Sequence, residues 1–192
     1  MFYSQKDLIK KFKFKKLGAN VLISDKASIY NSENISIGNN VRIDDFCILS
    51  PGSSLNIGNY IHIACYTSII GLGNVYIEDF ANLSSRVSVY TSNDDYTGVG
   101  MTNPMIPKEF RNVANGDVII KRHTIIGCNC VILPNVTLNE GVSVHALSLI
   151  YKDCSAYGVY AGVPAKYIRP RKKDFLLKEK QFLEIQINKG TI

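Results

Sequence analysis

The aliphatic residues in the second half of the chain recur every six positions. They are Ile120, Ile126, Ile132, Leu138, Val144 and Ile150. Small or medium side chains stand four positions after each of the first five, at Thr124, Cys130, Val136, Val142 and Ser148. An α-helix repeats every ~3.6 residues and a flat strand every ~2 residues, so a period of six fits neither. It predicts short strands separated by corners.

The first half of the chain repeats every twenty residues. The segments NISIGNNVRI, SLNIGNYIHI and NVYIEDFANL, at 34–43, 54–63 and 74–83, align position by position. Two more six-residue steps follow each segment, to Ile43 and Leu49, Ile63 and Ile69, and Leu83 and Val89. Three such units make one triangular coil, and two extra residues lengthen a corner. We therefore expect an all-β solenoid, a parallel β-helix of about six coils from Val21 to Asp153, roughly 30 Å long at ~4.8 Å per coil.

The regular spacing of aliphatic residues stops after Thr91 and resumes at Val118. Residues 91–117 therefore form an extended loop, and loops of this length inside a compact repeat are typically functional. Asn93, Asp94 and Asp95 also suit a tight turn, so turn formation alone is an alternative reason for their presence.

Both ends of the chain depart from the repeat. Ser4, as a helix cap, predicts a short helix over 4–13, and apolar spacing predicts an amphipathic helix over 172–187. We expect both helices to cover strand edges at the ends of the solenoid. The predicted organisation is an N-terminal cap (1–20), a β-helix domain with the inserted loop (21–171) and a C-terminal helical tail (172–192).

Composition narrows the class of protein. The 192 residues are 46% hydrophobic and 20% charged, with a formal net charge of +6, which suits one domain with a core and excludes a disordered polyelectrolyte. Basic residues gather at the two ends without the interleaved aromatic residues of a nucleic-acid motif, so no nucleic-acid partner is expected. Five cysteines without a CxxC pair, and no apolar run long enough to span a membrane, favour a cytoplasmic protein.

The segment YGVYAGVPAKYIRPR, residues 157–171, follows the last six-residue steps. Together they resemble the hexapeptide-repeat acyltransferases, in the branch of sugar acetyltransferases that includes enzymes of lipopolysaccharide and O-antigen biosynthesis. The resemblance covers about residues 21–171. It implies a left-handed β-helix, a homotrimer with active sites between neighbouring subunits, and acetyl-CoA as the acyl donor.

The resemblance also implies coenzyme-binding residues. The backbone at Cys128 and Ala146 matches positions that contact the pantetheine amides in this family. A turn that closes the site matches Gly162, Pro164 and Ala165. Basic residues near the adenosine phosphates match Lys166, Arg169 and Arg171, where fixed cations suit a multiply charged anion.

Acyl transfer to a hydroxyl group needs a base, which in the related sugar O-acetyltransferases is a histidine on the loop. This chain has Thr91-Ser92-Asn93-Asp94 in the corresponding stretch and no histidine between residues 63 and 122. Asp94 and Asp95 are therefore either the replacement for that histidine or the partners of His62. Of the chain's three histidines, His62 faces outward and is expected to be the base, assisted by Asp94 or Asp95. His123 directly follows the loop and is an alternative base, and His145 is expected to be structural or a coenzyme contact.

Polar and aromatic residues of the loop suit sugar binding. The candidates are Asn93, Tyr96, Asn103 and Arg111 on the loop, and Arg42 and Asn82, which the twenty-residue register places on either side of His62.

Three alternatives stay open. Because an amine is a stronger nucleophile than a hydroxyl, the missing loop histidine favours an N-acetyltransferase for a nucleotide-linked amino sugar as a rival to an O-acetyltransferase. A catalytically inactive binding or assembly module is the non-enzyme alternative. The three histidines do not share one register position, so they are not expected to converge on zinc, and no metal is expected.

Overall fold

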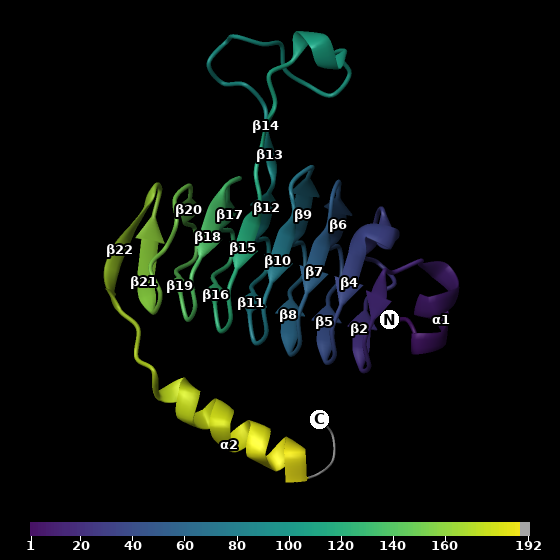
Figure 1. Cartoon of the computed structure of the whole chain (residues 1–192), viewed down its shortest axis with the longest axis vertical. Coiled ribbons are helices and arrows are strands. Elements are labelled where there is room, and N and C mark those ends of the chain that lie inside the picture. Colours follow the sequence, from purple (N-terminus) through teal and green to yellow (C-terminus); the bar gives the residue numbers. More distant parts are fainter. Residues whose placement is uncertain (189–192) are drawn as a thin grey trace.

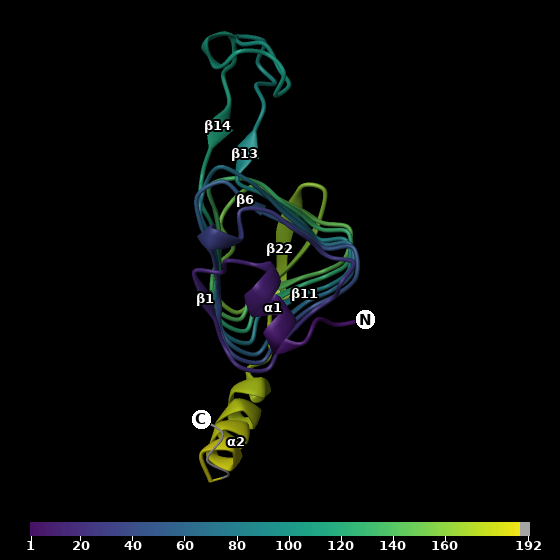
Figure 2. The same ribbon diagram turned by 90° about the vertical axis from the view of Figure 1, so that its right-hand side faces the viewer.

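The polypeptide winds into a left-handed parallel β-helix of triangular cross-section (Figures 1 and 2). The structure, a computed structural model, describes residues 1–188. Each coil contributes one strand to each of three sheets, which we name A, B and C in the order in which the chain meets them. Strands that are neighbours in a sheet are mostly a whole coil apart in sequence, as in the pairing of Ile37 with Ile57. The expected solenoid is confirmed.

The three sheets run along the length of the solenoid. Sheet A contains β1 (Lys16–Leu17), β4 (Ile35–Ile37), β7 (Leu55–Ile57), β10 (Val75–Ile77), β15 (Val118–Ile120) and β18 (Val136–Leu138). Sheet B contains β2 (Val21–Ile23), β5 (Val41–Ile43), β8 (Ile61–Ile63), β11 (Asn82–Leu83), β16 (Ile125–Ile126), β19 (Ser143–Val144), β21 (Gly158–Gly162) and β22 (Ala165–Pro170). Sheet C contains β3 (Ser28–Ile29), β6 (Ile48–Pro51), β9 (Ser68–Gly71), β12 (Ser88–Tyr90), β17 (Val131–Ile132) and β20 (Leu149–Ile150).

The solenoid is slightly longer than the repeat predicts. Its first strand begins at Lys16 instead of Val21, and β21 adds a strand of a seventh coil after six complete ones. Strand β22 then turns back antiparallel to β21. At the C-terminal end the spacing is lost, because the inward Tyr160 of β21 stands ten residues after Ile150.

The core lies along the axis of the solenoid and is filled by the aliphatic residues of the repeat. Ile37, Ile63, Ile69 and Ile120 are all fully buried, with 0% of each residue exposed. Each coil alone would leave its inward face in water, so burial against the next coil supplies the hydrophobic stabilisation that holds the stack together.

The corners contain residues in the left-handed backbone conformation, once per coil. At the corner between sheets A and B, the A/B corner, these include Asn40, Tyr60, Phe80 and His123, with φ between 56° and 61°. At the corner between sheets B and C, the B/C corner, they are Phe46, Tyr66, Arg86, Asn129 and Leu147, with φ between 58° and 63°. A non-glycine residue in this conformation costs about 1–2 kcal/mol, which stacking of side chains on successive coils helps to offset.

The N-terminal helix behaves as expected. Helix α1 (Gln5–Lys11) is capped by Ser4, whose hydroxyl accepts from the Asp7 N–H at 3.1 Å. Leu8 is fully buried in the core cluster, so the helix closes the first coil. A one-turn 3-10 helix, η1 (Ser32–Asn34), follows β3.

The C-terminal helix α2 (Asp174–Asn188) does not cover the end of the solenoid, and this expectation was wrong. It runs back beside the coils, outside the A/B corner (Figure 1). The antiparallel strand β22 occupies the open edge of β21 instead. The last four residues of the expected tail, 189–192, lie outside the described residues. Neither helix in residues 1–188 is long and apolar enough to cross a membrane.

The inserted loop leaves the solenoid at the corner between sheets C and A. It projects outward, transverse to the solenoid axis (Figures 1 and 2). Its stalk is the antiparallel pair β13 (Ser92–Asn93) and β14 (Ala114–Asn115), and a 3-10 helix, η2 (Lys108–Phe110), lies beyond the stalk. The buried Thr91 anchors the base, because its carbonyl accepts from the Gly116 N–H at 3.0 Å.

Candidate active site

The B/C corner gathers most of the predicted coenzyme positions along one edge of the solenoid. Cys128 and Ala146 occupy equivalent places on consecutive coils, and both are exposed. The turn between β21 and β22 carries Gly162 and Pro164 to the same edge, one coil further on. Gly162 has a φ of 107°, which favours glycine.

A buried hydroxyl ties this terminal turn to the corner. Ser148 donates from Oγ to the His145 carbonyl at 2.7 Å and accepts from the Gly162 N–H at 3.1 Å. His145 itself is exposed beside Ala146. The predicted positions at Cys128, Ala146 and Gly162 are therefore held in one line.

The same edge presents a row of unpaired backbone N–H groups. Within residues 1–188, no acceptor lies on the N–H groups of Asp45, Cys65, Ser85, Cys128 and Ala146, which stand at equivalent places on five coils. Such groups can donate to the amide oxygens of an extended ligand, or to the oxyanion of a tetrahedral intermediate.

The predicted basic residues divide between two corners. Lys166 directly follows the terminal turn at the B/C corner and is exposed, with no ion pair in the described part of the chain. Arg169 lies further along β22, and its guanidinium donates to the Pro170 carbonyl at 3.3 Å.

Arg171 does not join this site. Its guanidinium lies at the A/B corner, where it donates to the carbonyls of His123 at 2.8 Å and Gly141 at 3.0 Å. Burial lowers its pKa. Strand β22 has crossed the width of sheet B before Arg171 is reached, so within one chain Arg171 is separated from Lys166, and its contact with a coenzyme phosphate stays a prediction.

His62 has a carboxylate partner, but not the expected one. Its Nε2 lies 2.8 Å from Asp44, which also accepts from Arg42 Nε at 2.7 Å. Burial alone would raise the pKa of Asp44, but the hydrogen bonds from His62 and Arg42 outweigh it and lower that pKa. Within one chain, the predicted pairing of His62 with a loop aspartate was wrong, because the loop leaves from the corner opposite sheet B.

The register around His62 is as predicted. Arg42, His62 and Asn82 are direct neighbours on β5, β8 and β11. All three side chains alternate with buried aliphatic residues and face outward, close to the B/C corner.

The two loop aspartates differ in what they bind. Asp95 accepts from the Thr97 N–H and hydroxyl, at 2.8 and 2.6 Å, and from the Gly100 N–H at 2.6 Å. These hydrogen bonds lower the pKa of Asp95 to about 2. Asp95 therefore folds the loop and is poorly suited to accept a proton. Asp94 is exposed, and within residues 1–188 its carboxylate has no hydrogen-bond partner.

Asp94 lines a cavity of about 710 Å³ at the junction of the loop and its stalk. Asn93, Lys108 and Arg111 also line it. Arg111 Nε is buried without a hydrogen-bond partner. A charge that is left unpaired in this way can bind a polar or anionic ligand. Of the other predicted loop residues, Tyr96 points into solvent with 86% of it exposed.

Asn103 serves the loop itself. It adopts a φ of 77°, and its side-chain oxygen accepts from the Met105 N–H at 3.0 Å. This contact shapes the turn before η2, and it leaves the amide nitrogen of Asn103 free to bind a ligand.

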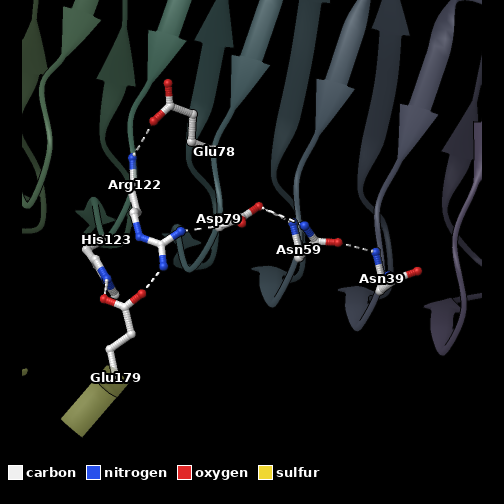
Figure 3. Close-up of polar contacts among 7 residues, drawn as sticks. All are labelled: Asn39, Asn59, Glu78, Asp79, Arg122, His123 and Glu179. Atoms are coloured by element: carbon white, nitrogen blue, oxygen red, sulfur yellow. Dashed lines mark hydrogen bonds and ion pairs between the residues drawn. The ribbon is translucent and has the colours of Figure 1, made fainter. Parts of the chain in front are cut away.

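His123 lies away from the groups of the B/C corner and lines a different cavity, of about 360 Å³, so its role as an alternative base stays a prediction. It lies at the A/B corner, where Nε2 donates to Glu179 of α2 at 2.7 Å (Figure 3). Its ring stacks on Phe80, with centroids 5.1 Å apart and planes 8° from parallel. Burial lowers the pKa of His123, and the nearby charge of Arg122 adds to this effect.

The network around His123 fastens α2 to the coils (Figure 3). Arg122 pairs with Glu179 and, at 3.4 Å, with Asp79. Asp79 in turn accepts from the Asn59 N–H of the preceding coil at 2.7 Å. This network therefore holds α2 against the coils at the A/B corner.

The histidines do not form a metal site. His62 lies on sheet B, His123 at the A/B corner and His145 at the B/C corner. Residues 1–188 hold no cluster of three or more His, Cys, Asp or Glu side chains able to bind a metal ion.

Ser84 is a further polar residue of this edge that the sequence did not predict. It stands at the B/C corner, between the coils of Ala64 and Gly127, and its N–H donates to the Ile126 carbonyl at 2.9 Å. Its hydroxyl has no partner in the described part of the chain. The twenty-residue register could have drawn attention to it, since it puts Ser84 in line with Asp44 and close to Asn82.

Comparisons with known proteins identify the family. No family model matches the chain. The chain is 52% identical, over 183 residues and 95% of both lengths, to the dTDP-4-amino-4,6-dideoxy-D-glucose acyltransferase of Escherichia coli. It is 28% identical over 123 residues, 56% of this chain and 63% of that one, to the putative lipopolysaccharide biosynthesis O-acetyl transferase WbbJ of E. coli K12.

Solved structures agree. AntD, an N-acyltransferase from Bacillus cereus, is 48% identical in its D94A variant, with a TM-score of 0.92 over 95% of this chain and 97% of that one. That structure contains dTDP and coenzyme A. Its S84A variant, 47% identical with a TM-score of 0.90 over the same shares, contains dTDP-4-amino-4,6-dideoxyglucose and coenzyme A.

These relatives support N-acylation of a nucleotide-linked amino sugar over O-acetylation, and an enzyme over an inactive module. The chain is an acyltransferase of the hexapeptide-repeat β-helix class, and it belongs to the family of dTDP-4-amino-4,6-dideoxy-D-glucose acyltransferases.

Proposed function

We propose that this enzyme transfers an acyl group from acyl-CoA to the amino group of a dTDP-linked 4-amino-4,6-dideoxy sugar, at a site shared by two subunits of a homotrimer in the cytoplasm. The E. coli relative and AntD support the acceptor class. Acetyl is the expected acyl group, although one AntD structure contains 3-hydroxybutyryl-CoA, so the donor is part of the test. The proposal rests on Asp94 and Ser84, which belong to the same coil.

Two residues link this chain to AntD. The AntD variants replace Ser84 or Asp94 in that protein, and the same residue types stand at the same numbers here. In this chain both side chains are free of hydrogen-bond partners within residues 1–188. Groups left free in this way are available to a substrate.

Ser84 and Asp94 cannot act together within one subunit. Ser84 precedes β12 at the B/C corner, and Asp94 follows β12 at the opposite side of sheet C. Yet they belong to one coil, so they stand at one height along the solenoid. A threefold axis parallel to the solenoid axis keeps each residue at the same height along that axis in every subunit. It would therefore place the loop of one subunit level with Ser84 of the next subunit.

The loop has the surface that such a contact requires. Beyond the stalk it exposes Tyr96 and Met105, at 86% and 88%. Apolar side chains held this far from the core commonly mark an interaction surface. A neighbouring subunit would cover them and complete the site.

The proposed reaction uses Asp94 as the proton acceptor. The sugar amine attacks the thioester carbonyl, a C–N bond forms, and the C–S bond breaks to release the coenzyme A thiolate. The proton lost by nitrogen passes to Asp94 and from there to the thiolate or to solvent. The Ser84 hydroxyl would orient the amine, and the unpaired Ser85 N–H would stabilise the oxyanion.

The coenzyme would extend along the later coils of the same corner. Cys128 and Ala146 offer N–H groups to the pantetheine amides, the turn at Gly162 closes the path, and Lys166 meets the phosphates. The His62–Asp44 pair lies on the other side of Ser84, towards the N-terminus. His62, with Nδ1 free, is therefore a second candidate base.

Mixed trimers test the shared site. Ser84→Ala and Asp94→Asn should each be nearly inactive, because each removes one half of every site. When the two variants are co-expressed, about a quarter of the sites in a random closed ring combine an intact Ser84 with an intact neighbouring Asp94. We expect activity to return to about that level. Absence of recovery in verified mixed trimers would contradict the shared site.

An acceptor panel tests the chemistry. Release of free thiol from acetyl-CoA and 3-hydroxybutyryl-CoA is followed with dTDP-linked amino sugars and with the matching sugars that carry a hydroxyl group. We expect turnover only with the amino sugars. Turnover with the hydroxyl sugars alone would overturn N-acylation.

A further inference from the structure

We infer that the N-terminal end of the solenoid is a docking surface for an anionic lipid bilayer, which it contacts through the outer face of α1. The inference goes beyond the proposed function, because acyl transfer between two soluble substrates does not need a membrane. It rests on the charge of this end, on the side chains that α1 turns away from the core, and on the shape of the end face.

The first residues of the chain are strongly basic. Residues 1–16 contain six lysines and one aspartate, so their side chains carry a formal charge of +5, against +6 for the whole chain. Within residues 1–188, no ion pair involves Lys6, Lys10, Lys13, Lys15 or Lys16. Asp7 accepts from the hydroxyl of the helix cap, and Asp25 pairs with the N-terminal amine. The positive charge of these lysines therefore favours an anionic partner.

Helix α1 has one face on the core and the other in solvent. Leu8 is fully buried, whereas Lys6 and Lys10, one helical turn apart, lie on the opposite face. Ile9 stands beside them and is 67% exposed. A basic helix face with an exposed aliphatic side chain suits a membrane interface, because the cations attract anionic headgroups and the apolar group enters the acyl boundary. A soluble anion offers no such boundary to Ile9.

The helix is already folded where it would bind. Its capped N-terminus and the burial of Leu8 hold it against the first coil. Binding therefore does not cost the free energy of ordering a disordered segment, which lowers the affinity of unfolded peptides for their targets. Such a helix would lie on a bilayer without crossing it.

The end face is open to a flat surface. Seen along the solenoid axis, α1 lies in front of the stacked coils (Figure 2). In the described part of the chain, neither the inserted loop nor α2 extends past α1 along that axis (Figure 1). A threefold axis parallel to the solenoid axis would bring three copies of α1 to the same side. Simultaneous binding of three weak contacts raises the overall affinity, and this step rests on the proposed homotrimer.

The other basic end of the chain is placed differently. Arg171 donates to backbone carbonyls, and Lys166 is the proposed contact of a coenzyme phosphate. The ammonium nitrogen of Lys173 lies 3.9 Å from the centre of the Tyr157 ring. A membrane at that end would also cover the turn that closes the coenzyme path. The N-terminal end is therefore the one that can bind a surface while the enzyme turns over.

Vesicle sedimentation tests the surface directly. The trimeric enzyme is mixed with vesicles of phosphatidylethanolamine and phosphatidylglycerol, or of phosphatidylcholine alone, and the bound fraction is measured. We expect binding to the anionic vesicles only, with a decrease at higher salt because the charges are screened. Absence of binding to the anionic vesicles at low salt would overturn the inference.

Charge variants locate the contact. Lys6→Gln/Lys10→Gln should weaken binding at least about twenty-fold, since each lysine near an anionic surface contributes about five-fold. Both side chains are exposed and glutamine is a good helix former, so this variant should fold. Lys172→Gln/Lys180→Gln removes the same charge from exposed positions near the C-terminus and is the matched control, which should bind as the wild type does. Equal losses in the two variants would show non-specific attraction to net charge and would overturn the docking surface.

Ile9→Ser and inorganic phosphate separate a lipid surface from a soluble anion. The serine variant should weaken vesicle binding about three- to ten-fold by removing the apolar contact. Inorganic phosphate, at the phosphate concentration of the vesicles, should not release the wild-type enzyme. Full release would assign this end to a soluble anion and overturn the lipid assignment.

Acyl transfer measured in the same samples keeps the two hypotheses apart. All variants should turn over soluble substrates at the wild-type rate, which also verifies that they are folded. An enzyme that transfers acyl groups but does not bind anionic vesicles would overturn only the docking surface. One that binds the vesicles but does not acylate the amino sugar would contradict only the proposed function.

Discussion

Sheet B lies between two corners of similar construction. At each corner, one residue per coil adopts the left-handed conformation, and aromatic side chains stack from coil to coil. At the A/B corner, Phe175 and Phe182 of α2 cover the rings, and Glu179 forms an ion pair with Arg122 and a hydrogen bond with His123. At the B/C corner, the rings of Phe46 and Tyr66 remain half exposed.

The difference teaches that the backbone of the repeat does not determine which corner binds a substrate. The same left-handed turn supports the packing of α2 on one side of sheet B and the candidate active site on the other. The deciding feature is whether another segment of the same chain, such as α2, packs over the aromatic rings of the corner. Four changes test this division, and they follow in order of decreasing effect.

The largest effect is expected for Asp94→Asn. Loss of the proton acceptor should lower kcat/KM about 10²–10⁴-fold, while the free energy of unfolding changes by less than about 0.5 kcal/mol because the side chain is exposed. Steady-state kinetics and urea unfolding measure both. His62→Gln is the comparison, and the assignment of the base would be reversed if it lost this activity while Asp94→Asn kept it.

Phe182→Ala should act on stability alone. It removes the edge-on contacts of α2 with Tyr60 and Phe80, at 5.2 and 6.2 Å, and should lower the free energy of unfolding by about 1–3 kcal/mol. Activity per folded enzyme should stay the same. Ile187→Ala, at an exposed position of the same helix, is the control and should have little effect. Lost activity at unchanged stability would show that the A/B corner is functional.

Substitutions of Lys166 and Arg171, which lie at opposite sides of sheet B, should have smaller and different effects on coenzyme binding and stability. Lys166→Gln should raise the KM for acyl-CoA about ten-fold by removing a charged donor to a phosphate. Arg171→Gln should leave that KM unchanged and instead lower stability, since it removes the donor to the carbonyls of His123 and Gly141. Equal effects of the two variants on KM would contradict the division.

The smallest effect is a pH dependence of stability from His123. Its pKa is lowered in the folded protein, so the unfolded chain takes up a proton first as pH falls. The contribution is present above the unfolded pKa of about 6.5 and is lost as pH falls from that value through the lower folded pKa. Thermal unfolding between pH 8 and 5 should show this loss. His123→Phe, which keeps the stacked ring, should reduce it, and an unchanged profile would assign the dependence to other groups.

Much of the fold could be predicted from the sequence because the repeat is local. The six-residue spacing predicts the inward residues, the interruption after Thr91 predicts the loop, and the segment after Tyr157 predicts the terminal turn. The partner of His62 could not be predicted in this way. Asp44 is eighteen residues away, and it meets His62 only because the coil brings a corner beside the next strand.

The positions of two other predicted residues have the same cause. Arg171 and His123 appear in the sequence close to candidate site residues, but the width of sheet B separates them from the B/C corner. Ser84 was not predicted because a serine at a corner carries no special signal in the sequence. Its position becomes informative only when it is compared with that of Asp94 along the solenoid axis.

The sequence by itself determined the solenoid and its inserted loop, since both depend on residues at fixed short spacings. The class of chemistry was implied by the resemblance of these repeats and of residues 157–171 to the hexapeptide-repeat acyltransferases. The tertiary structure alone decided which corner α2 covers, which aspartate is tied up in the loop and which is free, and which polar groups share one edge. Those features depend on contacts between coils, and closely spaced residues of one coil can lie at different corners. The free energy of such contacts is set by what stands beside a residue in space, not by what precedes it in the chain.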